Sequence, residues 1–251
     1  MADKAIKQQD QVKEIFKVVS QDYDHMNDII SLGTHKNWRH QLNNMIPFTK
    51  DMEVLDVATG TGDWAIATAP QVKHLTGLDY SPDMLEKARP KIAKAGLTDK
   101  ITLVEGDGTD MPFESNTFDI VTIGFGLRNM PSPEAGLKEL VRVVKPGGIV
   151  VIFEASQVDN PIIRPFWHFY MTHIIPLFGR TFSDHPDEFI YLHQTIDNFV
   201  SKKQLKKLME QFGLTNVKYK NFMLGSAAVH FGRKPADLIS EPKTKSKSKK
   251  K

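Results

Sequence analysis

The sequence predicts an α/β fold built on a doubly wound, mostly parallel sheet. Short apolar runs that suit buried strands alternate with helical patterns between residues 53 and 153. The first run ends in a glycine-rich turn, Thr59 to Gly62, directly before a helical pattern. Acidic or glycine residues follow the carboxyl ends of four runs, where sheets of this kind bind ligands. We therefore expect one ligand crevice at that edge of the sheet.

Composition places the chain among ordinary globular proteins. Its 251 residues suit one domain with an added cap and tail. The absence of cysteine excludes disulfides, cysteine nucleophiles and cysteine-based zinc sites, and it fits a reducing compartment. The first ten residues are polar, unlike a signal peptide, and no apolar run reaches the length of a membrane span. We expect a cytoplasmic protein.

The charge is unevenly distributed along the chain. The net charge is +3, but six lysines lie in the last nine residues, so the remainder carries −3. The body is therefore not a basic nucleic-acid-binding domain, and no nucleic-acid partner is expected. The tail over residues 236–251 has little to bury and is expected to be disordered. Two interpretations of it stay open: a solubilising tail, or weak attraction to anionic lipid or RNA.

Two helices are predicted before the first strand. The first follows an apolar pattern over residues 10–31, interrupted by the polar cluster Tyr23 to Asp28. The second runs from about His35 to the stop at Pro47. This N-terminal pair, residues 1–48, either forms a helical lid over the carboxyl edge of the sheet or packs on its flank.

The glycine turn after the first strand, which begins at Glu53, suits a ligand site. Glycine lets the backbone approach a ligand and present N–H groups at a helix start, here from Trp64 to Ala69. Such turns also serve simply to pack a helix on a sheet.

The second strand, Val72 to Leu78, ends at Asp79. An acidic residue there can accept hydrogen bonds from two ribose hydroxyls. A lone aspartate is more often a helix cap, but Ser81 and Pro82 already start the next helix, which runs to about Ala95.

The third and fourth strands, Ile101 to Val104 and Phe118 to Ile123, place two more residues at the crevice. Asp107 follows the third strand, where a carboxylate could accept from an adenine amino group, and Gly124 follows the fourth. A helix from Pro133 to Val144 and a strand from Ile149 to Phe153 complete the parallel part.

The C-terminal part begins with an aromatic insertion over residues 155–200. Its stripe between Pro161 and Gly179 is core or, if the insertion covers the crevice, pocket wall. A helix from Ser201 to Phe212 precedes two strands that predict an antiparallel edge hairpin: Val217 to Leu224 and Ala227 to Phe231. The main domain is therefore expected over residues 49–235.

Several motifs resemble those of known enzymes. The run Asp56 to Gly62, with Asp79 and Asp107, resembles the class I methyltransferases that use S-adenosylmethionine. Two longer stretches, Tyr23 to Arg39 and Arg128 to Gly148, resemble the signatures of the ubiquinone/menaquinone biosynthesis C-methyltransferases. The resemblance, to which Tyr191 to Ile196 adds, covers about Phe16 to Arg233.

The resemblance implies methyl transfer from S-adenosylmethionine to a ring carbon of a reduced polyprenyl naphthoquinol. It implies contacts to the cofactor from nine residues: Ala58, Gly60, Thr61, Gly62, Asp79, Tyr80, Asp107, Gly108 and Gly124. Ala58 replaces the usual first glycine of the loop, and Gly124 stands where some relatives carry serine. Single His and Asp residues without ligand spacing predict no metal site.

Arg128 is the first candidate for catalysis. A sulfonium methyl is already electrophilic, so the enzyme must align the acceptor and stabilise a quinolate with a base or a cation. The alternative is a salt bridge from Arg128 to Asp24 or Glu154. Asp24, His35 and Tyr191 are further candidates for base or hydroxyl contact, and each could equally be structural.

The resemblance also implies partners for the chain. The aromatic segment Phe166 to Phe178 would hold the ring and the first part of the prenyl chain, while the rest stays in the bilayer. We therefore expect transient, peripheral membrane contact, and a homodimer is possible.

Three rival functions stay open. Another lipid, sterol or phenol could be the acceptor, whereas Gly124 to Asn129 lacks the signature of amino-group methylation. The chain could instead be an S-adenosylmethionine-binding scaffold subunit of a quinone-biosynthesis complex. An RNA-associated protein led by the lysine tail is the third.

Overall fold

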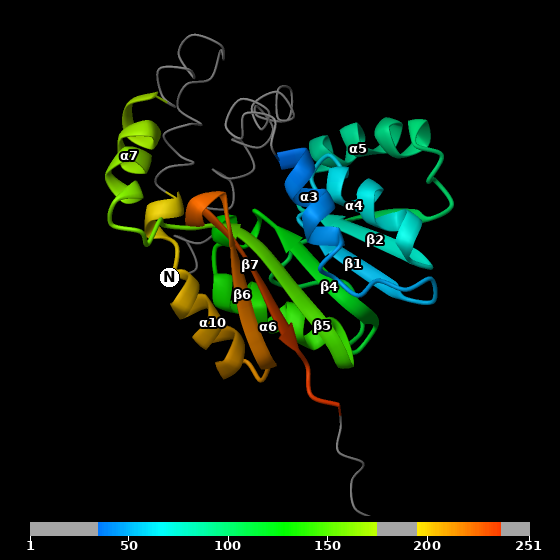
Figure 1. Ribbon diagram of the computed structural model, residues 1–251. Helices are drawn as coiled ribbons and strands as arrows, with labels where there is room; N and C mark the ends of the chain where they lie inside the picture. Colours follow the sequence, from blue (N-terminus) through cyan, green and yellow to red (C-terminus); the bar gives the residue numbers. More distant parts are fainter. Residues whose placement is uncertain (1–34, 175–194, 237–251) are drawn as a thin grey trace, which may run out of the picture.

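The computed structural model describes residues 35–174 and 195–236 and is built around a seven-stranded sheet (Figure 1). The strand order is β3-β2-β1-β4-β5-β7-β6. The five strands β1 to β5 are mutually parallel, and β7 is antiparallel to both β5 and β6. The predicted parallel sheet with a C-terminal antiparallel hairpin is confirmed. The strands are β1 (Glu53–Val57), β2 (His74–Asp79), β3 (Ile101–Glu105), β4 (Phe118–Gly124), β5 (Val144–Ala155), β6 (Thr215–Phe222) and β7 (Ala227–Arg233).

The order of the strands reverses between β1 and β4. Val54 of β1 pairs with Leu75 of β2 on one side and with Ile120 of β4 on the other. The chain runs outward through β2 and β3, then returns past β1 to form β4. A crevice opens at such a reversal, outside the carboxyl ends of the two central strands.

One strand is longer than its apolar run predicts. The strand β5 was expected from Ile149, but it begins at Val144, which pairs with Phe118 directly after the preceding helix. An irregularity in the β4–β5 pairing and a positive φ of 80° at Gly147 accommodate the run Lys145 to Gly148 within the strand. The preceding helix ends at Val143, close to the predicted end, but residues 145–148 belong to the strand β5.

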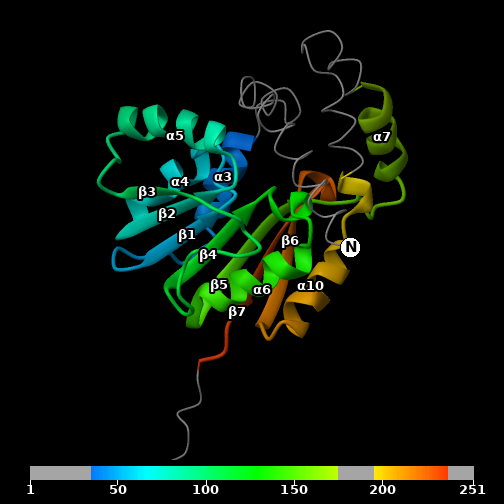
Figure 2. The same ribbon diagram turned by 180° about the vertical axis from the view of Figure 1, so that it is seen from behind.

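Helices cover both faces of the sheet (Figures 1 and 2). One face carries α3 (His35–Asn43), α4 (Asp63–Thr68) and α5 (Pro82–Lys94), and the other carries α6 (Pro133–Val143) and α10 (Lys202–Gln211). Serine hydroxyls cap α5, α6 and α10 by accepting from a backbone N–H of the first turn: Ser81, Ser132 and Ser201. The predicted Ser-Pro start of α5 is confirmed.

The alternation of side chains along the strands gives one core on each face. Leu55 of β1 and Val121 of β4 pack in the core beneath α6 and α10. Val54 and Ile120, one residue earlier on each strand, pack in the core beneath α3, α4 and α5. Both cores hold the central strands, and hence the loops that follow them, in place.

The helix α3 packs on the flank of the sheet. Leu42 is fully buried, and the Asn43 side chain accepts a hydrogen bond of 2.8 Å from Nε1 of Trp64 in α4. The earlier predicted helix and most of the proposed lid, residues 1–34, lie outside the described residues, as do residues 175–194 of the insertion and the tail from residue 237. The predicted domain limits stay predictions.

The aromatic segment is only partly packed. It forms α7 (Ile163–Phe169) and a π-helical turn from Tyr170 to Ile174. Met171 is buried, but Phe166 is 75% exposed and Phe169 is 56% exposed. Of the two interpretations of the stripe, core does not fit the outer side chains of α7, and a pocket wall stays a prediction.

Candidate functional site

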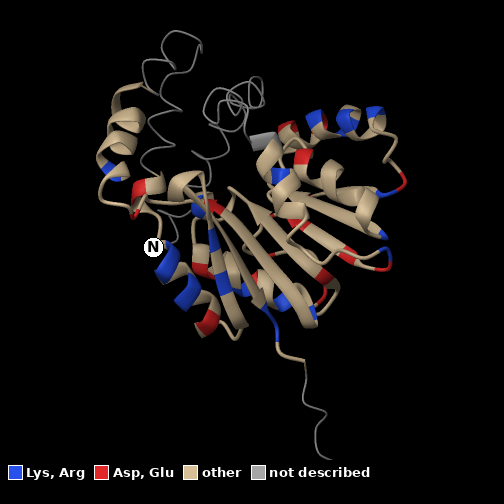
Figure 3. Ribbon diagram, viewed as in Figure 1, with Lys and Arg blue, Asp and Glu red and all other residues tan. Residues whose placement is uncertain are grey.

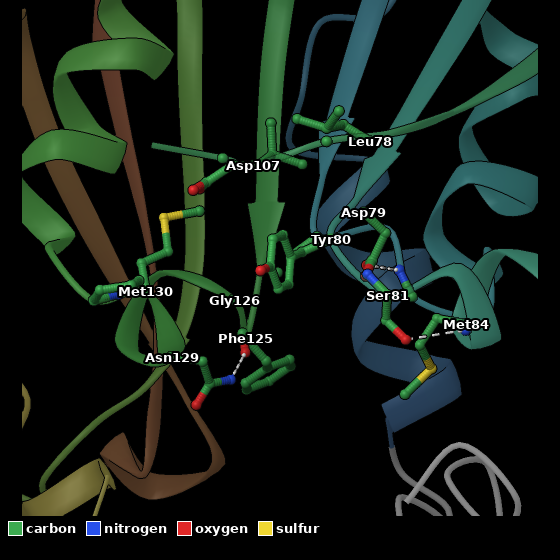
Figure 4. Close-up of a pocket in the computed structure, with 17 residues that line it drawn as sticks. Leu78, Asp79, Tyr80, Ser81, Met84, Asp107, Phe125, Gly126, Asn129 and Met130 are labelled. Atoms are coloured by element: carbon green, nitrogen blue, oxygen red, sulfur yellow. Dashed lines mark hydrogen bonds between the residues drawn. The ribbon is translucent and has the colours of Figure 1, made fainter. Parts of the chain in front are cut away.

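The cavity at the reversal between β1 and β4, called the main cavity below, is shown in Figure 4. Its walls come from the loops after β1, β2, β3 and β4. Each predicted loop contributes the expected residue: Gly60, Asp79, Asp107 and Gly124 all line it. The convergence of four loops on one crevice is confirmed.

The glycine turn provides space instead of hydrogen-bond donors. The N–H of Gly60 donates to Oδ2 of Asp79 at 2.7 Å, and the N–H of Gly62 donates to the carbonyl of Thr59 at 3.0 Å. A Cβ on Gly60 would meet nothing within 4 Å, whereas one on Gly62 would lie 3.3 Å from Cβ of Ala88 in α5. Gly62 thus packs a helix and does not line the main cavity.

Asp79 is held rigidly by backbone groups. Its Oδ1 accepts from the N–H of Ser81 at 2.9 Å, while Oδ2 accepts from Gly60. Burial is the main effect on the carboxyl, and it raises the pKa of Asp79 above its ordinary value. A third backbone hydrogen bond, from Tyr80, helps to fix the carboxylate in the cavity wall, where it can accept from a ligand hydroxyl. The next residue, Tyr80, stands at the cavity mouth with 37% of its surface exposed.

Asp107 and Gly108 form the wall after β3. Oδ1 of Asp107 accepts from the backbone N–H and the hydroxyl of Thr109, at 2.7 and 2.8 Å. A Cβ on Gly108 would lie 2.4 Å from Cε of Met130, so glycine leaves room for this methionine beside the cavity. Figure 4 shows Asp107, Met130 and Tyr80 around the same opening.

A second cavity adjoins the first and has a charged end. It shares Ala58, Gly60, Gly124 and Phe125 with the main cavity, and its other walls are Trp38, Arg39, Asp56, Thr59, Thr61, Asp63, Trp64 and Phe153. Nη1 of Arg39 lies 3.0 Å from Oδ2 of Asp63. Lys91 pairs with the same carboxylate and bonds the Thr61 hydroxyl at 3.0 Å. A cation and a carboxylate therefore stand together at this end.

Asp56 is a buried carboxylate in the wall of the second cavity. It accepts from the hydroxyls of Thr122 and Thr59, at 2.7 and 2.8 Å. Burial nevertheless raises the pKa of Asp56 to about 6. The carboxyl therefore changes its charge just below neutral pH.

The floor between the cavities is backbone in an uncommon conformation. Ala58 and Phe125 have positive φ angles of 53° and 55°. The Phe125 carbonyl accepts from Nη1 of Arg128 at 2.8 Å and from Nδ2 of Asn129 at 3.1 Å, which stabilises the strained turn. A Cβ on Gly126 would lie 2.4 Å from Cβ of Ala58, so alanine in place of the usual loop glycine requires glycine opposite.

Packing explains why residue 124 is glycine. A Cβ there would lie 2.9 Å from Cε3 of Trp64. The indole therefore fills the space that a serine side chain would need at this position. Gly124 still lines both cavities.

Arg128 forms a buried ion pair with Glu154 of β5. The two side chains are 9% and 2% exposed, and the guanidinium also lies over the Phe125 ring. Among the described residues, Nε of Arg128 has no hydrogen-bond partner, and neither cavity has Arg128 in its wall. One of the two salt bridges considered from the sequence is therefore present, and a catalytic role for Arg128 stays a prediction.

The other candidate catalytic residues are not placed by the structure. Asp24 and Tyr191 lie outside the described residues, and so does the side chain of His35, the first residue of α3. Among described residues, no group of three His, Asp or Glu side chains is arranged to hold a metal ion.

Sequence reasoning did not single out several cavity residues. Arg39 and Asp63 come from separate helices, and nothing in their local pattern joins them. Met84 follows the Ser81 cap by three positions, which places it on the crevice side of the first turn of α5, and this signal was available. Asn129 and Met130 follow Arg128 in the loop after β4.

Comparison with known proteins now decides the family. A model of the ubiE/COQ5 methyltransferase family matches residues 4–234, nearly the whole chain. The chain belongs to this family. It is therefore a methyltransferase with the class I fold, as the resemblance of its sequence motifs implied.

Two bacterial relatives match over almost their full length. A demethylmenaquinone methyltransferase of Lactiplantibacillus plantarum is 44% identical over 228 residues, covering 90% of this chain and 96% of the relative. A demethylmenaquinone methyltransferase of Staphylococcus aureus is 41% identical over 231 residues, covering 91% and 95%.

A solved structure supports the fold. A putative S-adenosylmethionine-dependent methyltransferase of Methanococcus maripaludis superposes with a TM-score of 0.64 at 20% identity, covering 89% of this chain and 95% of that one. No helix in residues 35–174 and 195–236 is long and apolar enough to cross a bilayer.

Proposed function

We propose that the chain methylates a ring carbon of demethylmenaquinol to give menaquinol, with S-adenosylmethionine as the methyl donor. The observation that carries this proposal is the identity of 44% to a demethylmenaquinone methyltransferase over 90% of the chain. The two adjoining cavities of the family fold support it, because one suits a nucleoside and the other a charged amino-acid end.

The residues of the main cavity fit the adenosine part of the donor. Asp79 offers two fixed oxygens to ribose hydroxyls, and Asp107 offers an acceptor to an adenine amino group. Apolar walls for a purine come from Met84 and Met130, with Tyr80 at the mouth. The open space at Gly60 leaves room for the ribose.

The charged end of the second cavity fits an α-amino acid. The guanidinium of Arg39 would hold a carboxylate, and the carboxylates of Asp56 and Asp63 would attract an ammonium group. When bound, S-adenosylmethionine supplies an electrophilic methyl group on a sulfonium. Two further residues that the resemblance implies for the cofactor act less directly. The Thr61 hydroxyl bonds Lys91 at the charged end, and Gly62 lets α4 pack closely against α5.

The protein must also exclude water from the bound acceptor and make the acceptor ring electron-rich. Trp38, Phe125 and Phe153 give an aromatic wall to the second cavity, which suits a naphthoquinol. The hydroxyl of the quinol has to lose its proton, and Arg128 would stabilise the resulting oxyanion from outside the cavity walls, by its charge or through an ordered water. Asp24, His35 or Tyr191 would accept the proton.

We further propose that the protein works in the cytoplasm and visits the membrane surface, where a polyprenyl quinol resides. The lysine tail would add attraction to anionic lipid. A homodimer is compatible with this scheme.

The test is transfer of a labelled methyl group by the purified chain to short-chain naphthoquinols, benzoquinols and simple phenols. Methylation of the naphthoquinol in preference to the phenol supports the proposal, and preference for the phenol contradicts it. Binding of S-adenosylmethionine without any transfer would favour the scaffold alternative. Asp79→Asn should weaken donor binding, whereas the exposed Asp99→Asn is the matched control.

A further inference from the structure

The helix α7 is apolar on two opposite sides. Trp167 faces inward and lines a groove, and Met171 behind it is buried. The other side carries Ile162, Phe166 and Phe169, spaced by four and three residues, so they form one stripe. The exposed fractions are 75%, 75% and 56%. Because the inner side already packs α7, the exposed stripe is not needed for folding and marks an interaction surface.

The start of this helix is well defined. The side-chain oxygen of Asn160 accepts from the backbone N–H groups of Ile162 and Ile163, at 2.9 and 3.3 Å. Ile162 therefore stands at a capped helix end, in line with the two phenylalanines.

Exposed cations lie on α7 and beside the groove that Trp167 lines, where Lys220 is one of the lining residues. No acidic residue occurs between Asn160 and Ile174, and Arg164 is exposed on α7 itself. Figure 3 shows further basic residues on α10 and on the edge strand β6, where Lys218 and Lys220 are exposed. An apolar stripe beside basic side chains is the pattern of a helix that lies in the surface of an anionic bilayer.

A mostly apolar groove lies on the inner side of α7, opposite the stripe. It is lined by Trp38, Trp167, Phe222 and Leu224, and Leu224 at its outer end is 75% exposed. Trp38 also lines the second cavity. Phe222 packs edge-on against Phe153 of the second cavity, with ring centroids 5.3 Å apart. Aromatic side chains thus continue from the inner side of α7 to the cavity.

We propose that α7 docks on an anionic phospholipid bilayer, and that the groove beside it receives the polyprenyl chain of the acceptor. Ile162, Phe166, Phe169 and Leu224 enter the headgroup region while the basic side chains contact lipid phosphates. This inference rests on the proposed function for the groove. A second copy suits the surface less well, because a two-fold pairing would bring the same basic residues together.

The test is flotation of the full chain with vesicles of phosphatidylcholine, with and without phosphatidylglycerol. Phe166→Ser and Phe169→Ser should each lower the partition coefficient by about tenfold, because a buried aromatic ring is lost. Arg164→Ser should lower it by about fivefold on anionic vesicles only. The matched control is Lys94→Ser, an exposed lysine on α5 at the far end of the molecule, which should leave it unchanged (Figure 1).

Two outcomes would overturn the inference. If both serine variants bind vesicles as the unaltered chain does, the membrane contact lies elsewhere, for example in the lysine tail. If sedimentation shows a dimer that the serine variants abolish, the occupant is a second copy. Circular dichroism verifies that each variant is folded. Methyl transfer by the unaltered chain to a soluble short-chain acceptor tests the proposed function separately.

Discussion

The buried carboxyl of Asp56 should make the stability of this protein depend on pH. Its pKa is about 6 in the folded protein, against an ordinary value of 3.8. The folded state therefore binds more protons than the unfolded state between these values. The contribution of Asp56 is favourable below pH 3.8 and is lost as the pH rises through about 6. The difference between these two pKa values corresponds to about 3 kcal/mol.

Asp56→Asn should remove this loss. The amide has the shape of the carboxyl without its charge, and the hydrogen bonds can be kept. The Thr122 hydroxyl also lies 3.3 Å from the Leu55 carbonyl, so it can donate there and accept from the new amide. The Thr59 hydroxyl continues to donate to the amide oxygen. We expect the free energy of unfolding to rise by about 1 to 3 kcal/mol at high pH. At a pH near the ordinary carboxyl pKa of 3.8 we expect little change.

Urea unfolding of both proteins at a series of pH values between about 4 and 8 measures this difference. Asp99→Asn, at an exposed carboxylate in the turn before β3, is the matched control and should change stability by less than about 0.5 kcal/mol. A difference between Asp56→Asn and the unaltered chain that is constant with pH would refute the reasoning, and so would a loss of stability at about pH 8.

Three further predictions concern buried residues. Gly126→Ala should cost about 1 to 3 kcal/mol in urea unfolding, because its Cβ meets that of Ala58, and adding Ala58→Gly should recover part of the loss; full additivity would contradict this. Glu154→Gln should cost about 3 kcal/mol, because Arg128 keeps a buried charge without its partner; an unchanged thermal midpoint would contradict it. Burial lowers the pKa of His230 to about 4 from 6.5, so its contribution to the free energy of unfolding rises with pH between these values. His230→Phe should abolish this rise in urea unfolding at a series of pH values. A rise that survives in the variant would exclude His230 as its cause.

The fold could be predicted because its signals are local. Apolar runs, Ser-Pro helix starts and glycine turns each concern a few neighbouring residues, and their order determines a parallel sheet with one crevice. Gly60, Asp79, Asp107 and Gly124 were placed correctly, since the carboxyl ends of parallel strands share one edge.

The partners of the site residues could not be predicted in the same way. The hydrogen bond between Gly60 and Asp79 joins residues 19 apart in the sequence. Because it uses the N–H of Gly60, the turn offers a ligand space and not this hydrogen-bond donor. Arg39 and Asp63 meet only because α3 packs on α4. The exposure of Phe166 and Phe169 also depends on what covers α7, and periodicity does not reveal this.

The most direct test of the proposed chemistry is single-turnover methylation by the purified chain. Labelled S-adenosylmethionine and a short-chain demethylmenaquinone are supplied, with the acceptor either reduced or oxidised, and the label is followed into the ring carbon. We expect transfer to the reduced acceptor alone, because only the quinol can give an electron-rich quinolate. Equal transfer to the oxidised acceptor, or transfer to oxygen instead of carbon, would contradict quinol C-methylation.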